Sequence, residues 1–138
     1  MNYYTPLTKI HEAAFKTCLK KVVEIAAKTE CNQILLAIPQ RGTLQGLIQE
    51  IMGIKFINKL LSNKKAKLDS LTFFLQTSHA KSSDFVKGPA LAAYSKPEQL
   101  KELSKTKNIL GIVLFSNAGD EIEEFKRMPD TEELEIIY

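Results

Sequence analysis

The chain has no tryptophan, only two cysteines and only two histidines among its 138 residues. Two cysteines cannot build the disulfide framework of a small secreted domain, and Cys18 and Cys31 lack the spacing of a zinc site. No apolar run reaches the roughly 18 residues that a membrane-spanning helix needs. The first residues also lack the charged start and apolar stretch of a secretory signal. We therefore expect a cytoplasmic protein with no bound metal, no cofactor and no membrane contact.

The composition is that of an ordinary globular domain. Hydrophobic residues make up 44% of the chain and charged residues 25%, which supplies a core without disulfide or metal crosslinks. The sequence contains no internal repeat, no low-complexity tract and no stretch that resembles a linker. These features predict a single domain over residues 1–138.

Amphipathic segments, which are typical of helices, alternate with short apolar runs, which are typical of strands buried on both faces. The periodicity predicts helices over residues 7–28, 44–61 and 97–105, and a short acidic helix from residue 119, and Gly53 is expected to end or kink the second of these helices. The apolar runs predict strands over residues 34–38, 90–94 and 109–115. Asp69-Ser70 suits the turn of a hairpin between residues 65–68 and 71–76, and residues 134–138 form either a last edge strand or an ordered tail.

This order of elements is α-β-α-β-β-α-β-α, with or without the last strand. It favours a three-layer α/β sandwich around a mixed, mostly parallel sheet. The clearest unit covers residues 90–115, where a strand, a helix and a second strand predict a right-handed parallel crossover. Ser95 is expected to cap the helix of this unit, and Pro97 suits its first turn.

The turn Gln40-Arg41-Gly42-Thr43 follows the first apolar strand. Ligands of open α/β sheets bind beyond the carboxyl ends of the strands, where helix N-termini present free N–H groups. Arg41 could add a bidentate contact to an anion, and Thr43 could cap the next helix. The turn is therefore a candidate anion site, although a plain strand-to-helix turn with Arg41 in solvent explains the same residues.

Ser95 and Ser116-Asn117 follow the two strands of the 90–115 unit. A parallel sheet would place them at the same edge as the 40–43 turn, so they join the candidate ligand-binding residues. The polar loop after residue 76 adds Ser78, His79 and Lys81. These residue types serve in hydrolysis, but their spacing matches neither a catalytic triad nor a nucleophile elbow. We interpret this segment as a surface loop that can contact a ligand or partner, and we assign no catalytic residue.

The net charge of +3 conceals an uneven distribution. Residues 1–107 hold 17 of the 19 basic and 8 of the 16 acidic residues, a charge of +9, whereas residues 108–138 carry −6. Such a split favours contact with an acidic partner or between two copies of the chain. One basic cluster stands out: Lys55, Lys59, Lys64, Lys65 and Lys67. With two arginines and no tryptophan in the chain, specific nucleic-acid readout is not indicated.

We therefore expect a non-enzymatic binding module for a small anionic ligand or a protein partner, assembled as a homodimer. The first alternative is an enzyme that acts on a phosphorylated or nucleotide-like substrate, in which Arg41 and the turn amides hold phosphate. The second is nonspecific, salt-sensitive association with nucleic acid through the lysines of residues 55–67.

Overall fold

The computed structural model describes residues 2–6, 11–78, 81–82, 84–116, 119–127 and 134–137. The helices and strands are, in chain order, β1 (Asn2–Tyr4), α1 (His11–Lys28), β2 (Gln33–Ala37), the 3₁₀ helix η1 (Arg41–Gln45), α2 (Leu47–Met52), α3 (Ile54–Asn63), β3 (Lys65–Leu68), β4 (Leu71–Gln76), β5 (Gly88–Ala93), α4 (Pro97–Lys105), β6 (Ile109–Phe115), α5 (Gly119–Arg127) and β7 (Leu134–Ile136).

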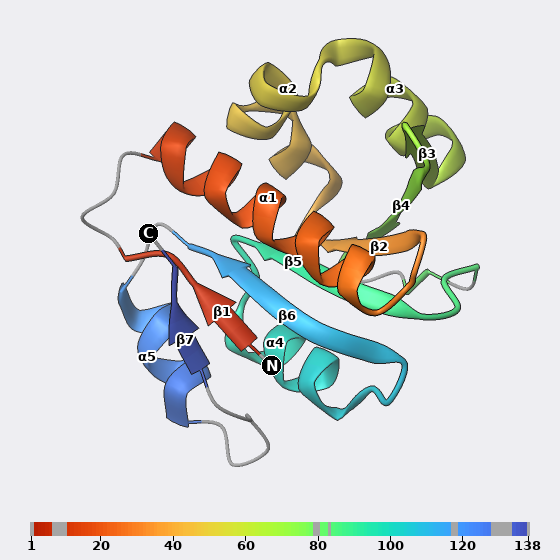
Figure 1. Ribbon diagram of the computed structural model, residues 1–138. Coiled ribbons are helices and arrows are strands. Elements are labelled where there is room, and N and C mark those ends of the chain that lie inside the picture. The colour runs from red at the N-terminus through yellow and green to blue at the C-terminus, as the bar shows by residue number, and fades with distance from the viewer. Residues whose placement is uncertain are drawn as a thin grey trace.

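One seven-stranded sheet runs through the molecule in the order β3-β4-β2-β5-β6-β1-β7. Only β3 is antiparallel to its neighbour, and every other pair of adjacent strands is parallel. Figure 1 shows α1, α2 and α3 above the sheet and α4 and α5 below it. The predicted three-layer α/β sandwich with a mixed, mostly parallel sheet is therefore confirmed.

The apolar strands divide their side chains between two cores. Ile34 and Leu36 of β2 belong to the core under α1, α2 and α3, whereas Leu35 and Ala37 belong to the core over α4 and α5. Successive residues of a strand point to opposite faces, so a strand covered on both sides must be apolar at every position. This requirement explains why these strands appear in the sequence as continuous apolar runs.

Several details differ from the sequence-based expectations. The helix predicted over residues 44–61 is broken at Gly53, as expected, where φ is 95°, and it is also broken at Gly46, so it consists of η1, α2 and α3. Thr43 lies inside η1 and caps no helix, and the residue before α4 is Lys96, so Ser95 is not its cap. The short strand β1 was not predicted, and residues 7–10 of the predicted first helix lie outside the described residues.

Other predicted elements are confirmed. β3 and β4 form the hairpin, with Asp69 of its turn at φ 55°. β5, α4 and β6 form the parallel crossover, and β7 is an edge strand paired with β1.

The connections leave the sheet on opposite faces on the two sides of its centre. β2 leads upward into η1, α2 and α3, whereas its neighbour β5 leads downward into α4 (Figure 1). Adjacent parallel strands whose connections leave in opposite directions open a crevice at their carboxyl ends.

Candidate functional site

Two neighbouring cavities lie at the carboxyl ends of β4, β2 and β5, and a third extends from them along one face of the sheet toward its amino edge. The largest, of about 500 Å³, separates the segment after β4 from the first turns of α4. It is of the size that small-molecule sites usually have. Its described lining residues are Gln76, Thr77, Ser78, Lys81, Lys96, Glu98, Gln99 and Glu102.

Hydrogen bonds to the end of β2 hold both walls of this large cavity. Ser95 Oγ donates to the carbonyl of Ala37 (3.0 Å), and Gln99 Nε2 donates to the carbonyl of Ile38 (3.1 Å). On the other side, the N–H of Ser78 donates to the carbonyl of Pro39 (3.2 Å). Both walls are thus hydrogen-bonded to the same segment, the end of β2 and the two residues that follow it.

Gln99 has an unusual environment. Its side chain is only 6% exposed, and its Oε1 has no hydrogen-bond partner among the described residues. The amide cannot satisfy this oxygen by turning over, because its Nε2 already donates to Ile38. A buried acceptor without a partner costs about 1–3 kcal/mol, and native proteins contain few of them. Gln99 therefore lines the large cavity while its Oε1 stays buried and without a described hydrogen-bond partner.

The charges of the large cavity are mixed. Lys81 Nζ lies 3.8 Å from Glu102 Oε2, and both side chains are largely exposed. Lys96 and Glu98 add one charge of each sign at the start of α4. The large cavity therefore has no strong net charge and many groups that can form hydrogen bonds.

The second cavity, of about 130 Å³, is basic. Arg41, Lys64 and Lys81 line it together with Leu75 and Thr77. Arg41 Nη2 donates to the carbonyl of Leu61 (2.6 Å), which holds the guanidinium against the last turn of α3. Lys64 ends α3 with a left-handed backbone (φ 62°). Among the described residues, neither Arg41 nor Lys64 has a carboxylate within ion-pair distance, so their positive charge is uncompensated.

The third cavity, of about 150 Å³, lies on the opposite face of the sheet and is partly apolar. Phe85 contributes an aromatic ring, which meets the ring of Phe74 edge-on at 5.9 Å. Three aliphatic side chains complete the apolar part of its lining: Leu35, Leu103 and Ile109.

The large cavity lies between the two small ones. It shares Thr77 and Lys81 with the basic cavity, and Gln76, Lys81 and Glu102 with the apolar cavity. Leu75 and Gln76 are consecutive in β4 and point to opposite faces of the sheet, which explains why they line different small cavities. The basic and the polar compartment therefore adjoin at the carboxyl edge, and the apolar compartment extends from the polar one toward the amino edge, where Asn108 and Ile109 line it.

The structure brings together some of the predicted site residues. Arg41 lines the basic cavity, Ser78 lines the large cavity, and Lys81 lines all three. Ser95 is fully buried and lines none of the three, and neither do Gln40, Gly42, Thr43 and Ser116. β5 lies between β2 and β6, so the turns after those two strands are not adjacent. His79 and Asn117 lie outside the described residues.

The sequence analysis did not name Gln99 or Thr77 as site residues, and it named Lys64 only as part of the basic cluster of residues 55–67. Lys64 and Thr77 follow α3 and β4, and only the parallel pairing of β4 with β2 brings both beside Arg41. Gln99 is a polar residue in the first turn of α4, directly before the apolar Leu100. This position is only a weak indication of a site residue.

Tyr94, which directly follows β5, is a further titratable group at this edge. Its backbone has φ 58°, and its ring meets Phe115 edge-on at 5.2 Å. Burial raises the pKa of the Tyr94 hydroxyl, so this group stays neutral near pH 7. It can form a hydrogen bond but does not supply a negative charge.

Within the described part of the chain, no group of three or more His, Cys, Asp or Glu side chains could hold a metal ion. No described helix has the length and apolar character to cross a membrane. No protein-family model, curated protein or solved structure matches the chain. The geometry of the three cavities is therefore the basis on which a function is proposed.

Proposed function

We propose that the protein is a non-enzymatic binding module for a small anionic ligand, held at the carboxyl edge of β4, β2 and β5. One observation carries the proposal: Arg41 and Lys64 line the basic cavity without a described carboxylate partner. Unpaired cations that surround a small cavity attract an anion, and an arginine can bind phosphate or carboxylate through two hydrogen bonds.

The adjoining compartments support binding of a larger molecule than a simple ion. The basic cavity adjoins the large cavity, since Thr77 and Lys81 line both. The ligand would place its negative group near Arg41 and its remaining polar groups in the large cavity. The described lining residues supply charge and hydrogen-bonding groups for such a ligand.

Calorimetric titration with inorganic phosphate, phosphosugars, nucleotides and small carboxylates tests the proposal. We expect at least one anion to bind, and Lys64→Gly to weaken it about tenfold, which corresponds to about 1.4 kcal/mol. Glycine tolerates the left-handed backbone of Lys64, so this variant removes the charge without straining the chain. Arg41→Ala should weaken binding too, although it also removes the bond to Leu61.

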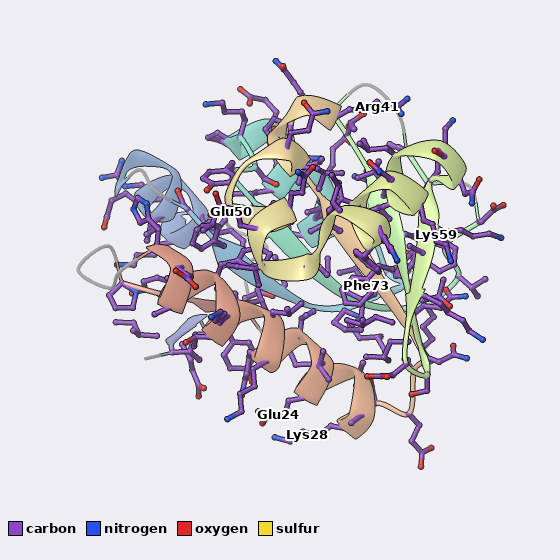
Figure 2. The ribbon with its side chains drawn as sticks, turned by 90° about the horizontal axis from the view of Figure 1, so that it is seen from above. Glu24, Lys28, Arg41, Glu50, Lys59 and Phe73 are labelled. Carbon is purple, nitrogen blue, oxygen red and sulfur yellow. The ribbon has the colours of Figure 1, made fainter. Side chains whose placement is uncertain are left out.

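Lys59→Ala is the matched control. Lys59 is an exposed lysine of α3 that lines none of the three cavities, and Figure 2 shows it well away from Arg41. Its loss lowers the net charge as much as the loss of Lys64, so it should leave affinity nearly unchanged. The proposal is wrong if no anion binds, or if Lys59→Ala weakens binding as much as Lys64→Gly. Turnover of a bound phosphoester would support the enzyme instead.

The homodimer and nucleic-acid association through residues 55–67 stay predictions that are independent of the cavities. Light scattering tests the first, because a monomer has a mass of 15.5 kDa and a dimer twice that value. Binding to a DNA duplex at low salt, and its loss at high salt, tests the second.

A further inference from the structure

We propose that the outer edge of β3 binds an extended acidic segment of a partner protein, which adds a strand to the sheet beside Lys65 and Lys67. This surface is separate from the anion site, because Lys65 and Lys67 line none of the three cavities. Two features point to it: the open backbone edge of β3 and the excess of positive charge around that edge.

The outer edge of β3 offers backbone groups for further hydrogen bonds. β3 is the last strand at its end of the sheet, and among the described strands it pairs only with β4. In such an antiparallel pair, residues that bond to the neighbouring strand alternate with residues that do not. The N–H of Leu75 donates to the carbonyl of Lys64 (2.9 Å), so Ala66, two positions on, also bonds to β4. The backbone groups of Lys65 and Lys67 therefore point outward, where a further strand can pair with them.

Lysine side chains surround this outer edge. Lys65 and Lys67 are exposed on β3, and Lys59 is exposed on α3, which packs against β3. Figure 2 shows Lys59 on the side of the molecule where β3 and β4 lie. Lys65 Nζ lies 4.0 Å from Asp84 Oδ2, whereas Lys59 and Lys67 have no carboxylate of a described residue within ion-pair distance. Most of this positive charge is therefore uncompensated.

The charge selects the kind of strand that can pair with β3. Lysines on an edge strand discourage pairing with an apolar strand, and like charges that lie opposite each other destabilise a pair. Two copies of β3 would bring their lysines together, so β3 does not suit pairing with itself. Lys65 and Lys67 are two positions apart and lie on the same face of β3. A strand with carboxylates at alternate positions matches both lysines, while its backbone pairs with the open edge.

Nucleic acid is the other polyanion that lysines attract. Proteins that bind single strands add exposed aromatic rings on which bases stack, but the aromatic rings nearest to β3, those of Phe56, Phe73 and Phe74, are buried. Nucleic acid also has no use for a row of outward backbone groups. An acidic peptide strand accounts for the charge and for the open edge, whereas nucleic acid accounts only for the charge.

The experiment is an NMR titration of the full chain with two peptides of equal charge. The first, Thr-Glu-Val-Glu-Val-Glu-Thr, can form a strand. In the second, prolines replace the valines, which removes backbone donors and prevents strand pairing. We expect the first peptide to bind at least about tenfold more tightly. Its binding should slow amide exchange at Lys65 and Lys67, whereas the amide of Ala66 is already protected by its bond to β4.

Lys67→Ala and Lys67→Pro form a matched pair of variants. Both remove the charge, but only proline also removes the outward N–H, and an edge strand tolerates proline at such a position. We expect Lys67→Ala to weaken binding severalfold and Lys67→Pro to weaken it at least about threefold more. Lys20→Ala is the control for net charge and should leave affinity nearly unchanged, because Lys20 is exposed on α1, which packs on β5 and β6. If Lys67→Pro does not fold, the amide exchange of the unmodified chain still decides the matter.

The outcomes separate the possible occupants of the edge. If the two peptides bind equally, or if Lys67→Ala binds the first peptide as tightly as the unmodified chain, the proposal is wrong. Salt-sensitive binding of a DNA duplex without binding of the first peptide would assign the lysines to nucleic acid instead. β7 ends the sheet on its other side and carries the exposed Glu135, so light scattering of the chain alone tests a second copy as the occupant. Self-association that Lys67→Glu abolishes would overturn the assignment to a separate partner.

Discussion

The two edges of the sheet use the same kind of side chain in opposite ways. At the amino edge, Gln33 of β2 accepts hydrogen bonds at its Oε1 from the N–H groups of Val86 (2.7 Å) and Lys87 (3.3 Å). Asn108 closes the same edge, since its Nδ2 donates to the carbonyl of Val86 (2.8 Å). At the carboxyl edge, the corresponding oxygen of Gln99 has no described partner.

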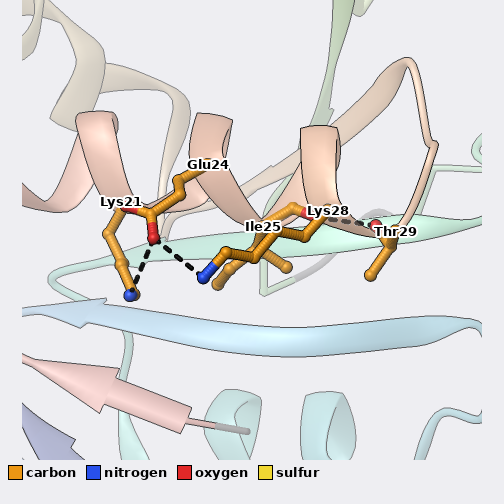
Figure 3. Close-up of polar contacts among 5 residues, drawn as sticks. All are labelled: Lys21, Glu24, Ile25, Lys28 and Thr29. Atoms are coloured by element: carbon orange, nitrogen blue, oxygen red, sulfur yellow. Dashed lines mark hydrogen bonds and ion pairs between the residues drawn. The ribbon is translucent and has the colours of Figure 1, made fainter.

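The charges differ between the edges in the same way. Near the amino edge, at the end of α1, Glu24 pairs with Lys28 (3.1 Å) and Lys21 (3.4 Å), as Figure 3 shows. Figure 2 places Lys28 and Arg41 at opposite ends of the molecule, and Arg41 has no described carboxylate partner. Among the described residues, the Arg41 guanidinium and the Gln99 oxygen at the carboxyl edge therefore lack the kind of partner that Glu24 and Gln33 have near the amino edge.

The largest expected effect comes from crowding the amino edge. A Cβ on Gly88 would overlap the backbone carbonyl oxygen of Gln33, so Gly88→Ala must push β5 away from β2. We expect a loss of about 3 kcal/mol in the free energy of unfolding, measured by urea denaturation. Gly42→Ala is the control, because its Cβ would meet no atom within 4 Å. Equal losses in the two variants would contradict the tight closure of the amino edge.

The next prediction compares the two glutamines directly. Gln33→Met leaves two N–H groups without their acceptor and should cost about 1–2 kcal/mol. Gln99→Met loses the bond to Ile38 but also removes the unpartnered Oε1, so the two effects oppose each other. We expect Gln99→Met to change stability by less than about 1 kcal/mol. If thermal or urea unfolding shows Gln99→Met to be the more damaging change, Gln99 serves the fold and not a ligand.

The sequence predicts this fold well because its central strands are buried on both faces. The apolar run from Ile34 to Ile38 must be covered from above and below, and a helix on either side of it supplies that cover. β1 was not predicted, since three residues are too few to show a periodicity. Its place depends on pairing with β6 and β7, which are more than a hundred residues away in the chain.

The candidate site was predictable only in part. Its position at the carboxyl edge and its use of Arg41 follow from the strand-to-helix order. Lys64 joins Arg41 because the 3₁₀ helix η1 brings Arg41 to the last turn of α3. The unmatched oxygen of Gln99 depends on which way one amide points, and no sequence pattern contains that information.

The smallest expected effect concerns the paired charges at the end of α1. Hydrogen bonds from Lys28 and Lys21 lower the pKa of Glu24, so the carboxylate stabilises the fold above its unfolded pKa. That contribution disappears as the pH falls through the lowered pKa of the folded state. The groups are exposed, so the change in stability should be slight and sensitive to salt. An NMR titration should show the pKa of Glu24 rising more in Lys28→Ala than in Lys21→Ala. An unchanged pKa of Glu24 in both variants would mean that neither lysine stabilises its carboxylate. The contrast in charge pairing between the two edges would then be wrong.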